Sequence, residues 1–229
     1  MIVSYASSPT FYPLLKASIT SLLEHNDVTK LYILAQEDEL PFEIPCNHQV
    51  INVSYQTYFP PYGANMRNNI FTYLAMIRSC LPDLIEEDKV ISLDSDLIVC
   101  DSLEPIWQID LTGKWLAWCP EYLGNWNPWQ HEHYYNFGVV VMNLAQMRKD
   151  NAVETVVNDL NTNWYGFPEQ DMFNKIAVPD LSVEIPERFN ECFATGQSDH
   201  PAIVHYAGYG DLRKKTKMLP RREYLEKYL

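Results

Sequence analysis

The sequence predicts an α/β protein built on one doubly wound, mostly parallel sheet. Over the first hundred residues, short apolar segments alternate with amphipathic helical segments, the pattern of parallel strands joined by helical crossovers. The 229 residues are 47% hydrophobic, which is enough for one sizeable core. No internal repeat, low-complexity tract or linker divides the sequence, so we expect a single domain over residues 1–229.

In the first half of the sequence, expected strands alternate with expected helices. Between the first two apolar segments, hydrophobic residues recur at spacings of three and four from Phe11 to Leu23, which predicts a helix that starts near Pro9 and Thr10. The segment 55–63 holds three Tyr, two Pro and one Gly, so we expect a loop there, followed by a helix over about 65–81. The strands expected in this half are 1–6, 30–35, 49–54 and 89–94.

The second half continues with longer apolar segments. Strands are expected at 114–121, 137–144 and 202–208. Helices are expected over about 145–161, over 169–177, and as a small amphipathic helix within 222–229.

Composition narrows the function. The formal charge of −13 disfavours binding to nucleic acid and to anionic lipid, because both are bound mainly through Lys and Arg. The basic stretch 212–222 is either a solvated segment or a contact for a phosphate or an anionic membrane. The longest apolar run, 137–142, is too short to cross a bilayer, and five scattered Cys without a CxxC pair fit a reducing compartment. We therefore expect a soluble, cytoplasmic protein without a transmembrane segment.

Two carboxylates at the end of a predicted strand point to a metal site. In "VISLDSDLIV" (90–99), Asp94 and Asp96 are two residues apart, and alternate residues of an extended segment point the same way. Their mutual repulsion is relieved by a divalent cation that bridges them to a phosphate, and hard oxygen ligands suit Mg²⁺ or Mn²⁺. A polar turn after the strand is the alternative.

Three further motifs follow the Asp pair in a fixed order. They are "YYNFGVVVMNLAQMRK" (134–149), "PEQDMFN" (168–174) and "IVHYAG" (203–208). With "DKVISLDSDLIV" (88–99), they give the sequence a resemblance, over about residues 3–208, to the retaining glycosyltransferases of family 8. That family includes lipopolysaccharide galactosyl- and glucosyltransferases and the glycogenins. The resemblance implies a single GT-A domain, Rossmann-like, with a mixed, mostly parallel sheet.

The resemblance also implies the roles of individual residues. Asp94, Asp96 and His205 match the family's ligands for Mn²⁺, with Mg²⁺ as a possible substitute. The matched catalytic residues are Gln170, Glu169, Asp171 and Asn136. The residues matched to donor binding are Ala6, Ser7, Ser8, Asp94, Ser95, Gly208 and Lys214. The implied donor is UDP-glucose or UDP-galactose, and the implied acceptor is a glycan, a lipid-linked sugar or a protein. Because an amide is a poor nucleophile, Gln170 favours front-face transfer over double displacement.

Three departures from the family pattern leave a second function open. "ASSPTFYP" (6–13) has no carboxylate to read uracil, Phe137 replaces a small residue of the Asn-x-Gly motif and is expected to narrow the sugar pocket, and the usual Lys-Pro-Trp after the His motif is absent. The alternative is a non-catalytic module of the same fold that binds nucleotide sugars or carbohydrates. A dehalogenase-type phosphatase and a nucleotidyltransferase fit less well, since their downstream Lys and Gly-rich motifs are absent.

Overall fold

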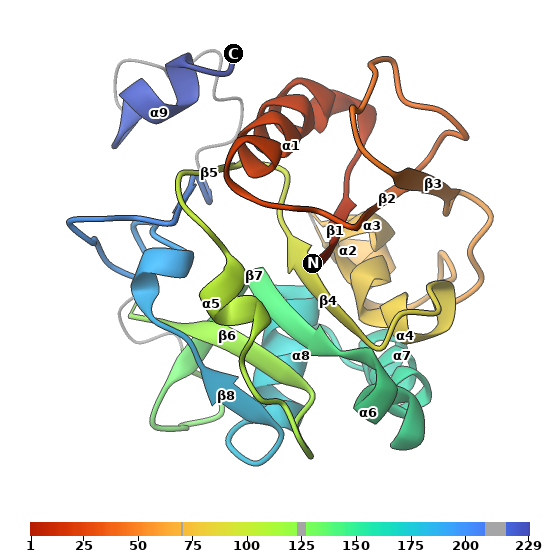
Figure 1. The fold of residues 1–229 in the computed structure, drawn as a ribbon. Helices are drawn as coiled ribbons and strands as arrows, with labels where there is room; N and C mark the ends of the chain where they lie inside the picture. The colour runs from red at the N-terminus through yellow and green to blue at the C-terminus, as the bar shows by residue number, and fades with distance from the viewer. Residues whose placement is uncertain (70, 123–126, 209–218) are drawn as a thin grey trace.

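A seven-stranded sheet forms the centre of the molecule (Figure 1). The computed structural model describes residues 1–69, 71–122, 127–208 and 219–229. The strands in spatial order are β3 (His48–Asn52), β2 (Lys30–Ala35), β1 (Ile2–Ala6), β4 (Lys89–Leu93), β7 (Tyr134–Asn143), β6 (Leu116–Glu121) and β8 (Ser182–Glu184).

The strand directions confirm the predicted mixed, mostly parallel sheet. β3, β2, β1 and β4 are parallel, whereas β7 is antiparallel to both of its neighbours, β4 and β6. β8 then pairs parallel with β6. The carboxyl ends of β1, β4 and β6 therefore meet at one edge of the sheet, where ligands collect in folds of this kind.

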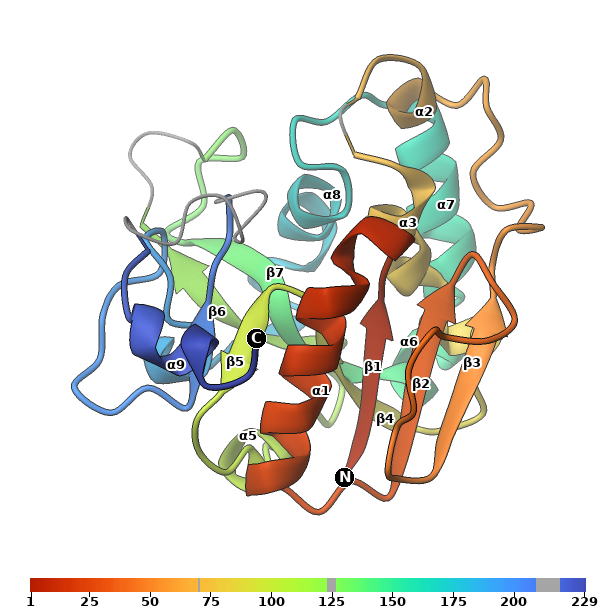
Figure 2. The same cartoon turned by 90° about the horizontal axis from the view of Figure 1, so that it is seen from above.

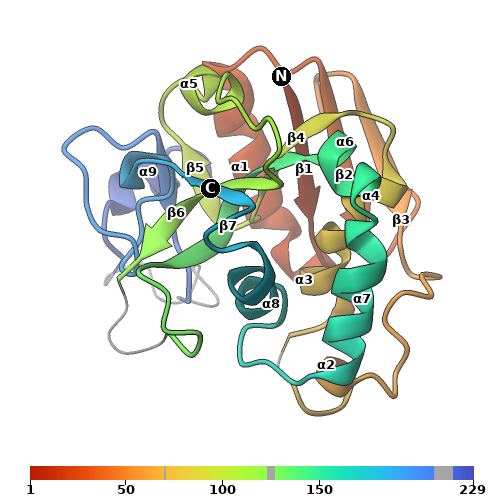
Figure 3. The same ribbon diagram turned by 90° about the horizontal axis from the view of Figure 1, so that it is seen from below.

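Helices cover both faces of the sheet. On one face, α1 (Tyr12–His25) packs beside β1, with α5 (Glu104–Trp107) at the far end (Figure 2). The other face carries α7 (Ala152–Thr162) and α8 (Pro168–Ala177), together with α6 (Leu144–Lys149) (Figure 3). Successive residues of β4 point to opposite faces of the sheet. Ile91 packs in the core on the α1 face, and Val90 packs in the core on the α7 and α8 face.

Two predicted helices are interrupted. The helix expected over 65–81 is instead α2 (Ala64–Asn68), α3 (Tyr73–Met76), the 3₁₀ turn η2 (Ile77–Cys80) and α4 (Leu81–Leu84). Asn69 is extended, and its side chain accepts from the N–H of Phe71 and donates to the carbonyl of Tyr165. Thr72 then caps α3. Such hydrogen bonds from side chains to the backbone compete with the hydrogen bonds of a helix. The segment therefore keeps the helical spacing of its apolar residues without forming one continuous helix.

The second interruption separates α6 from α7. Asn151 lies in the left-handed region with φ of 51°, which ends the helix expected over 145–161. Asn is one of the few residues that tolerate this conformation.

Short elements complete the fold. β5 (Leu97–Val99) and β9 (Ile203–His205) form a second, antiparallel sheet. The sequence did not predict β5, β8 or α5, which have only three or four residues each. The 3₁₀ turns η1 (Pro9–Phe11) and η3 (Glu187–Phe189) are also short. α9 (Arg222–Glu226) lies inside the small helix predicted for 222–229, and Leu225 packs against α1 and β9.

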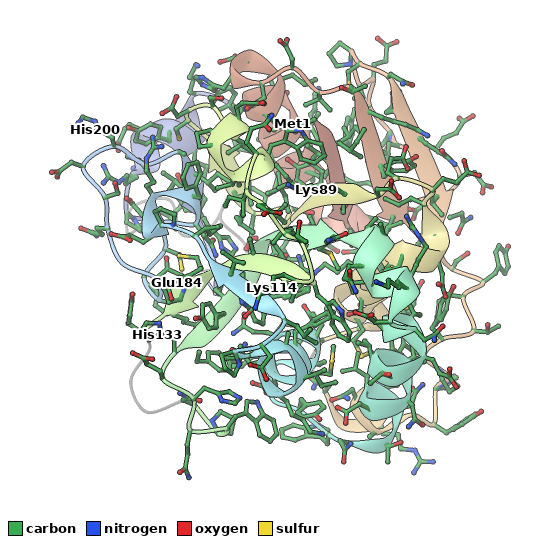
Figure 4. The ribbon with its side chains drawn as sticks, turned by 60° about the horizontal axis from the view of Figure 1, so that its bottom comes forward. Met1, Lys89, Lys114, His133, Glu184 and His200 are labelled. Atoms are coloured by element: carbon green, nitrogen blue, oxygen red, sulfur yellow. The ribbon has the colours of Figure 1, made fainter. Side chains whose placement is uncertain are left out.

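Two lysines tie loops to the sheet away from the carboxyl ends of its parallel strands. The Nζ of Lys89, at the start of β4, donates to the carbonyls of Trp107 and Ile109, each at 2.7 Å. The Nζ of Lys114 donates to the carbonyl of Asp180 (Figure 4). In the described part of the chain, no helix has the length and apolar character needed to span a bilayer.

Candidate active site

The two aspartates of the DxD motif lie in the turn between β4 and β5. Asp94 directly follows β4, and its backbone N–H donates to the carbonyl of Gly138 at 2.8 Å. Asp96 directly precedes β5, and its carbonyl accepts from the N–H of Tyr206 at 2.8 Å. The turn is therefore fastened to β7 on one side and to the end of β9 on the other.

Strand pairing brings His205 to the same point. In the β5–β9 ladder Leu97 lies opposite His205, so the imidazole is next to the DxD turn. Its Nε2 is 3.4 Å from Asp94 Oδ2 and 3.3 Å from Asp96 Oδ1. One ligand atom from each of the three residues lies within 4.8 Å of the others. Burial disfavours the imidazolium, but the two carboxylates outweigh this and raise the pKa of His205 well above its usual value.

Arg78 joins the DxD turn to α8. Its guanidinium is 2.6 Å from Asp94 Oδ1 and 3.2 Å from Glu169 Oε1, and only 5% of the residue is exposed. Burial acts to raise the pKa of Asp94, yet Arg78 and His205 reverse the effect and lower that pKa to about 2. For Glu169 burial prevails over Arg78, and the pKa is raised.

A second group of polar side chains lies between β6, β7 and α8. Asn136 Nδ2 and Gln170 Nε2 donate to the same oxygen of Glu121, at 2.9 and 3.1 Å. Gln170 Nε2 also contacts the hydroxyl of Tyr134, and Gln170 Oε1 accepts from the N–H of Phe137 at 2.9 Å. Burial raises the pKa of Glu121. The amide of Gln170 therefore has partners at both ends.

A cavity of about 260 Å³ joins these groups. Phe71, Phe167 and Phe193 contribute aromatic walls, while the polar lining converges from β4, β6, β7, α8 and β9. The predicted site residues that line it are Asp94, Asp96, Asn136, Glu169, Gln170, His205 and Gly208. Gly208 has φ of +76°, a conformation that favours glycine.

The other predicted site residues lie apart from this lining. Ser7 and Ser8 follow β1, and the carbonyl of Ala6 accepts from the hydroxyl of Ser95 at 3.3 Å, which places these residues beside the DxD turn. Asp171 is buried, where it accepts from the Tyr134 hydroxyl at 2.5 Å and from the N–H of Phe167. Lys214 lies outside the described residues.

Phe137 lies beneath the site rather than in it. Its ring is 1% exposed, stacks on Phe173 with centroids 4.8 Å apart, and carries the Arg78 guanidinium 4.7 Å above its centroid. Phe137 is absent from the lining of the cavity, so the expectation that it narrows this pocket was wrong, because this position of β7 faces the core between the sheet and α8.

Sequence reasoning missed two residues. Glu121 ends a predicted strand at the same edge of the sheet as Asp94, so its position could have marked it. Asn190 follows a 3₁₀ turn, where no periodicity signals a role, yet it is completely buried and contacts His205. His133, which the sequence did not assign to the metal, pairs with Glu184 at the end of β8 at 2.9 Å and is not part of the group formed by Asp94, Asp96 and His205 (Figure 4).

Comparison with known proteins gives the family of this chain. The family described as Glycosyl transferase family 8 matches residues 2–210. This chain belongs to that family, which confirms the resemblance drawn from the four motifs.

Several curated relatives are glycosyltransferases by name. Glycosyltransferase GlyD of Streptococcus pneumoniae is 33% identical over 227 residues, covering 85% of this chain and 26% of GlyD. Glycosyltransferase GlyA of the same organism is 26% identical over 166 residues, covering 68% of this chain and 23% of GlyA. The chain thus spans about a quarter of the length of these two proteins.

Solved structures confirm the GT-A fold. The galactosyltransferase LgtC, in complex with donor and acceptor sugar analogs, aligns with a TM-score of 0.68 at 19% identity, over 91% of this chain and 88% of LgtC. Glycosyltransferase GlyE of Streptococcus pneumoniae aligns with a TM-score of 0.71 at 18% identity, over 99% of this chain and 59% of GlyE.

Proposed function

We propose that residues 1–229 form one catalytic domain that transfers a hexose, with retention of configuration, from a UDP-sugar to a hydroxyl acceptor. Glucose or galactose is the proposed sugar. Asp94, Asp96 and His205 would hold the cation, Mn²⁺ or in its place Mg²⁺. The observation that carries the proposal is the convergence of these three side chains on one cavity with Arg78, Glu169 and Gln170.

The donor set of the site fits a divalent cation. Two carboxylates and one imidazole provide oxygen and nitrogen ligands, which suit Mn²⁺. The ring of His205 packs directly against Gly138. A Cβ added at Gly138 would lie 2.2 Å from Cε1 of His205, so only glycine leaves enough space for the imidazole.

The charge of the cavity also supports a cation. The ionisable side chains that line it are four carboxylates, Asp94, Asp96, Glu121 and Glu169, against Arg78 and His205. Two cationic groups leave this lining with an excess of negative charge, so a diphosphate would be repelled without an added cation. A bound divalent cation would stabilise the negative charge on the departing nucleotide diphosphate.

The protein's own side chains favour front-face transfer. A double displacement would need Gln170 to attack, but both ends of its amide are held by Phe137, Glu121 and Tyr134. Arg78 positions Glu169 at the first turn of α8. Together Glu169 and Gln170 would hold the sugar hydroxyls, and the developing oxocarbenium charge would lie near the Glu121 and Glu169 carboxylates. Asn136 and Asp171 would support these groups.

The nucleotide would lie over the carboxyl ends of β1 and β4. Ala6, Ser7, Ser8 and Ser95 would contact it through backbone and hydroxyl groups, and Gly208 and Lys214 would approach the diphosphate. The acceptor would be a glycan, a lipid-linked sugar or a protein hydroxyl. The cytoplasmic location expected from the sequence stays a prediction.

A thermal-shift panel tests the proposed donor. The purified protein is melted with UDP-glucose, UDP-galactose, other nucleotide sugars and UDP, each with and without Mn²⁺, because a ligand that binds the folded state raises the melting temperature. The Asp96→Asn variant removes one metal ligand. The control is Asp88→Asn, whose carboxylate is exposed and pairs with Arg148 remote from the site.

The outcomes separate the candidates. A Mn²⁺-dependent shift with one UDP-sugar, lost in Asp96→Asn and kept in Asp88→Asn, supports the proposal and identifies the donor. A melting-temperature shift with a nucleotide sugar of another base would mean that uracil is not the base of the donor, which is compatible with Ser7 and Ser8 after β1. A shift in a protein that then fails to release UDP from the same donor favours the non-catalytic module. No shift with any donor contradicts the proposal.

A further inference from the structure

We infer that Asn190 is a positioning residue that fixes the tautomer of His205 and thereby presents Nε2 to the divalent cation. The inference rests on the proposed metal site and adds to it a residue that is not part of the cavity lining. It follows from the hydrogen bonds that join Gly138, Asn136, Asn190 and His205, which we call the tautomer network.

The tautomer network starts from a backbone donor. The N–H of Gly138 donates to Asn136 Oδ1 at 2.9 Å. A backbone N–H cannot accept, so this contact identifies the atom of Asn136 that faces it as the oxygen. The other end of the Asn136 amide then donates from Nδ2 to a carboxylate oxygen of Glu121 at 2.9 Å, which agrees with the same orientation.

The orientation passes from Asn136 to Asn190. Asn136 Oδ1 lies 2.8 Å from Asn190 Nδ2, and since Oδ1 is an acceptor, the group that faces it has to be the NH₂ of Asn190. The other end of the Asn190 amide is therefore its oxygen. That oxygen is 2.8 Å from Nδ1 of His205.

His205 receives its tautomer from this contact. An amide oxygen only accepts, so Nδ1 carries a hydrogen, and in a neutral imidazole the lone pair then belongs to Nε2. Nε2 is the nitrogen that faces Asp94 Oδ2 and Asp96 Oδ1, at 3.4 and 3.3 Å. Metal-binding His residues commonly donate their second N–H to a carbonyl or carboxylate, which fixes the ring and its tautomer.

The surroundings hold the tautomer network rigid. Asn190 is 0% exposed and His205 is 4% exposed, so water does not compete for these bonds. The backbone of Asn190 is fixed by the hydroxyl of Thr195, which donates to its carbonyl. With Asn190 locked in place, the imidazole has one orientation available to it.

Two substitutions separate positioning from structural support. Asn190→Asp keeps an acceptor next to Nδ1 but places its second carboxyl oxygen against Asn136 Oδ1, so it should bind Mn²⁺ more weakly than the wild type and more tightly than Asn190→Leu. Asn190→Leu removes the acceptor and should weaken Mn²⁺ binding by about 10- to 100-fold, the range typical of groups that orient metal ligands. The affinity is measured for Mn²⁺ alone, from the EPR signal of the free ion.

A matched control removes a buried asparagine elsewhere. Asn65 is 1% exposed and makes three hydrogen bonds between α2 and the end of α7. Asn65→Leu should lower the melting temperature, as Asn190→Leu does, but leave the Mn²⁺ affinity unchanged. Wild-type affinity in Asn190→Leu, with Asp96→Asn unable to bind, would overturn the role of Asn190 while leaving the metal site intact.

A readout without metal tests the Nδ1–H hydrogen bond itself. In protein with ¹⁵N-labelled His, wild type and Asn190→Asp should show a slowly exchanging Nδ1–H for His205, whether or not Nε2 also carries a hydrogen, and in Asn190→Leu the Nδ1 hydrogen should exchange rapidly. Absence of that proton in the wild type would overturn the inference. If the proton is present but the wild type does not bind Mn²⁺, the proposed metal site is wrong. The positioning role of Asn190 is then wrong as well, although its hydrogen bond to His205 is confirmed.

Discussion

Gly138 is the position at which one methyl group should disturb the whole site. A Cβ at this residue would lie 2.2 Å from Cε1 and 2.6 Å from Nδ1 of His205. Ordinary contact begins at about 3.4 Å, so in Gly138→Ala the ring has to retreat by about 1.2 Å. Gly138 is absent from the residues with positive φ, so close approach, and not backbone conformation, accounts for the glycine.

The cost of Gly138→Ala follows from this displacement. Overpacking a filled interior costs about 1–3 kcal/mol, which for a chain of this size lowers the melting temperature by about 2–12 °C. The retreat also shifts Nε2 relative to Asp94 and Asp96, so Mn²⁺ affinity should fall by about 10- to 100-fold. Calorimetric melting and an EPR titration of Mn²⁺ measure the two effects.

A double-mutant cycle tests whether the imidazole is the cause. In a His205→Ala background the two nearest atoms are gone, and the third nearest, Asn136 Oδ1 at 2.9 Å, remains. Gly138→Ala should then cost much less than in the wild type, which gives a coupling energy of about 1 kcal/mol or more. An equal cost in both backgrounds would refute the reasoning.

Three other predictions concern stability. Arg78→Met leaves the buried carboxylate of Glu169 without its cationic partner and removes one partner from the partly exposed Asp94, so the free energy of unfolding in urea should fall by about 3–5 kcal/mol; a loss below about 1 kcal/mol would contradict this. Because the pKa of Asp94 is lowered to about 2, its ionised form adds stability above about pH 4 that is lost as the pH falls toward 2. Wild type should therefore lose more stability between pH 5 and pH 3 than Asp94→Asn, and equal losses would rule the effect out. Asn143 accepts from the N–H of Gln146 at the start of α6, so Asn143→Ala should cost about 1–2 kcal/mol in the same urea assay, while Gln146→Ala should cost about 0.5 kcal/mol or less.

The sheet could be predicted because its strands are long, apolar and regularly spaced. β1, β2, β4 and β7 all fall within or around predicted segments. The helices were harder, since apolar periodicity does not show where a side chain such as Asn69 or Asn151 ends a helix. β5 and β8 have three residues each, too few to carry a period.

For the candidate metal site, too, the local sequence pattern could be recognised and the tertiary contacts could not. Asp94 and Asp96 could be paired from their spacing alone, whereas His205 needed the family resemblance, because more than a hundred residues separate it from them. Its partner Asn190 could not be found at all, since the only signal is a tertiary hydrogen bond between the residue after η3 and the end of β9. Phe137 was misplaced because a change of residue type does not reveal which face of β7 it occupies.

The most direct test of the account is the Mn²⁺-dependent breakdown of a UDP-sugar followed by ¹H NMR. The wild-type protein is incubated with UDP-galactose or UDP-glucose, first with water and then with added glycan acceptors, and the anomeric signal of the first product is recorded before mutarotation. The account predicts UDP release that requires Mn²⁺, is abolished in Asp96→Asn, and yields the α-anomer first. Release without Mn²⁺, undiminished release in Asp96→Asn, or a β-anomer formed first would contradict it.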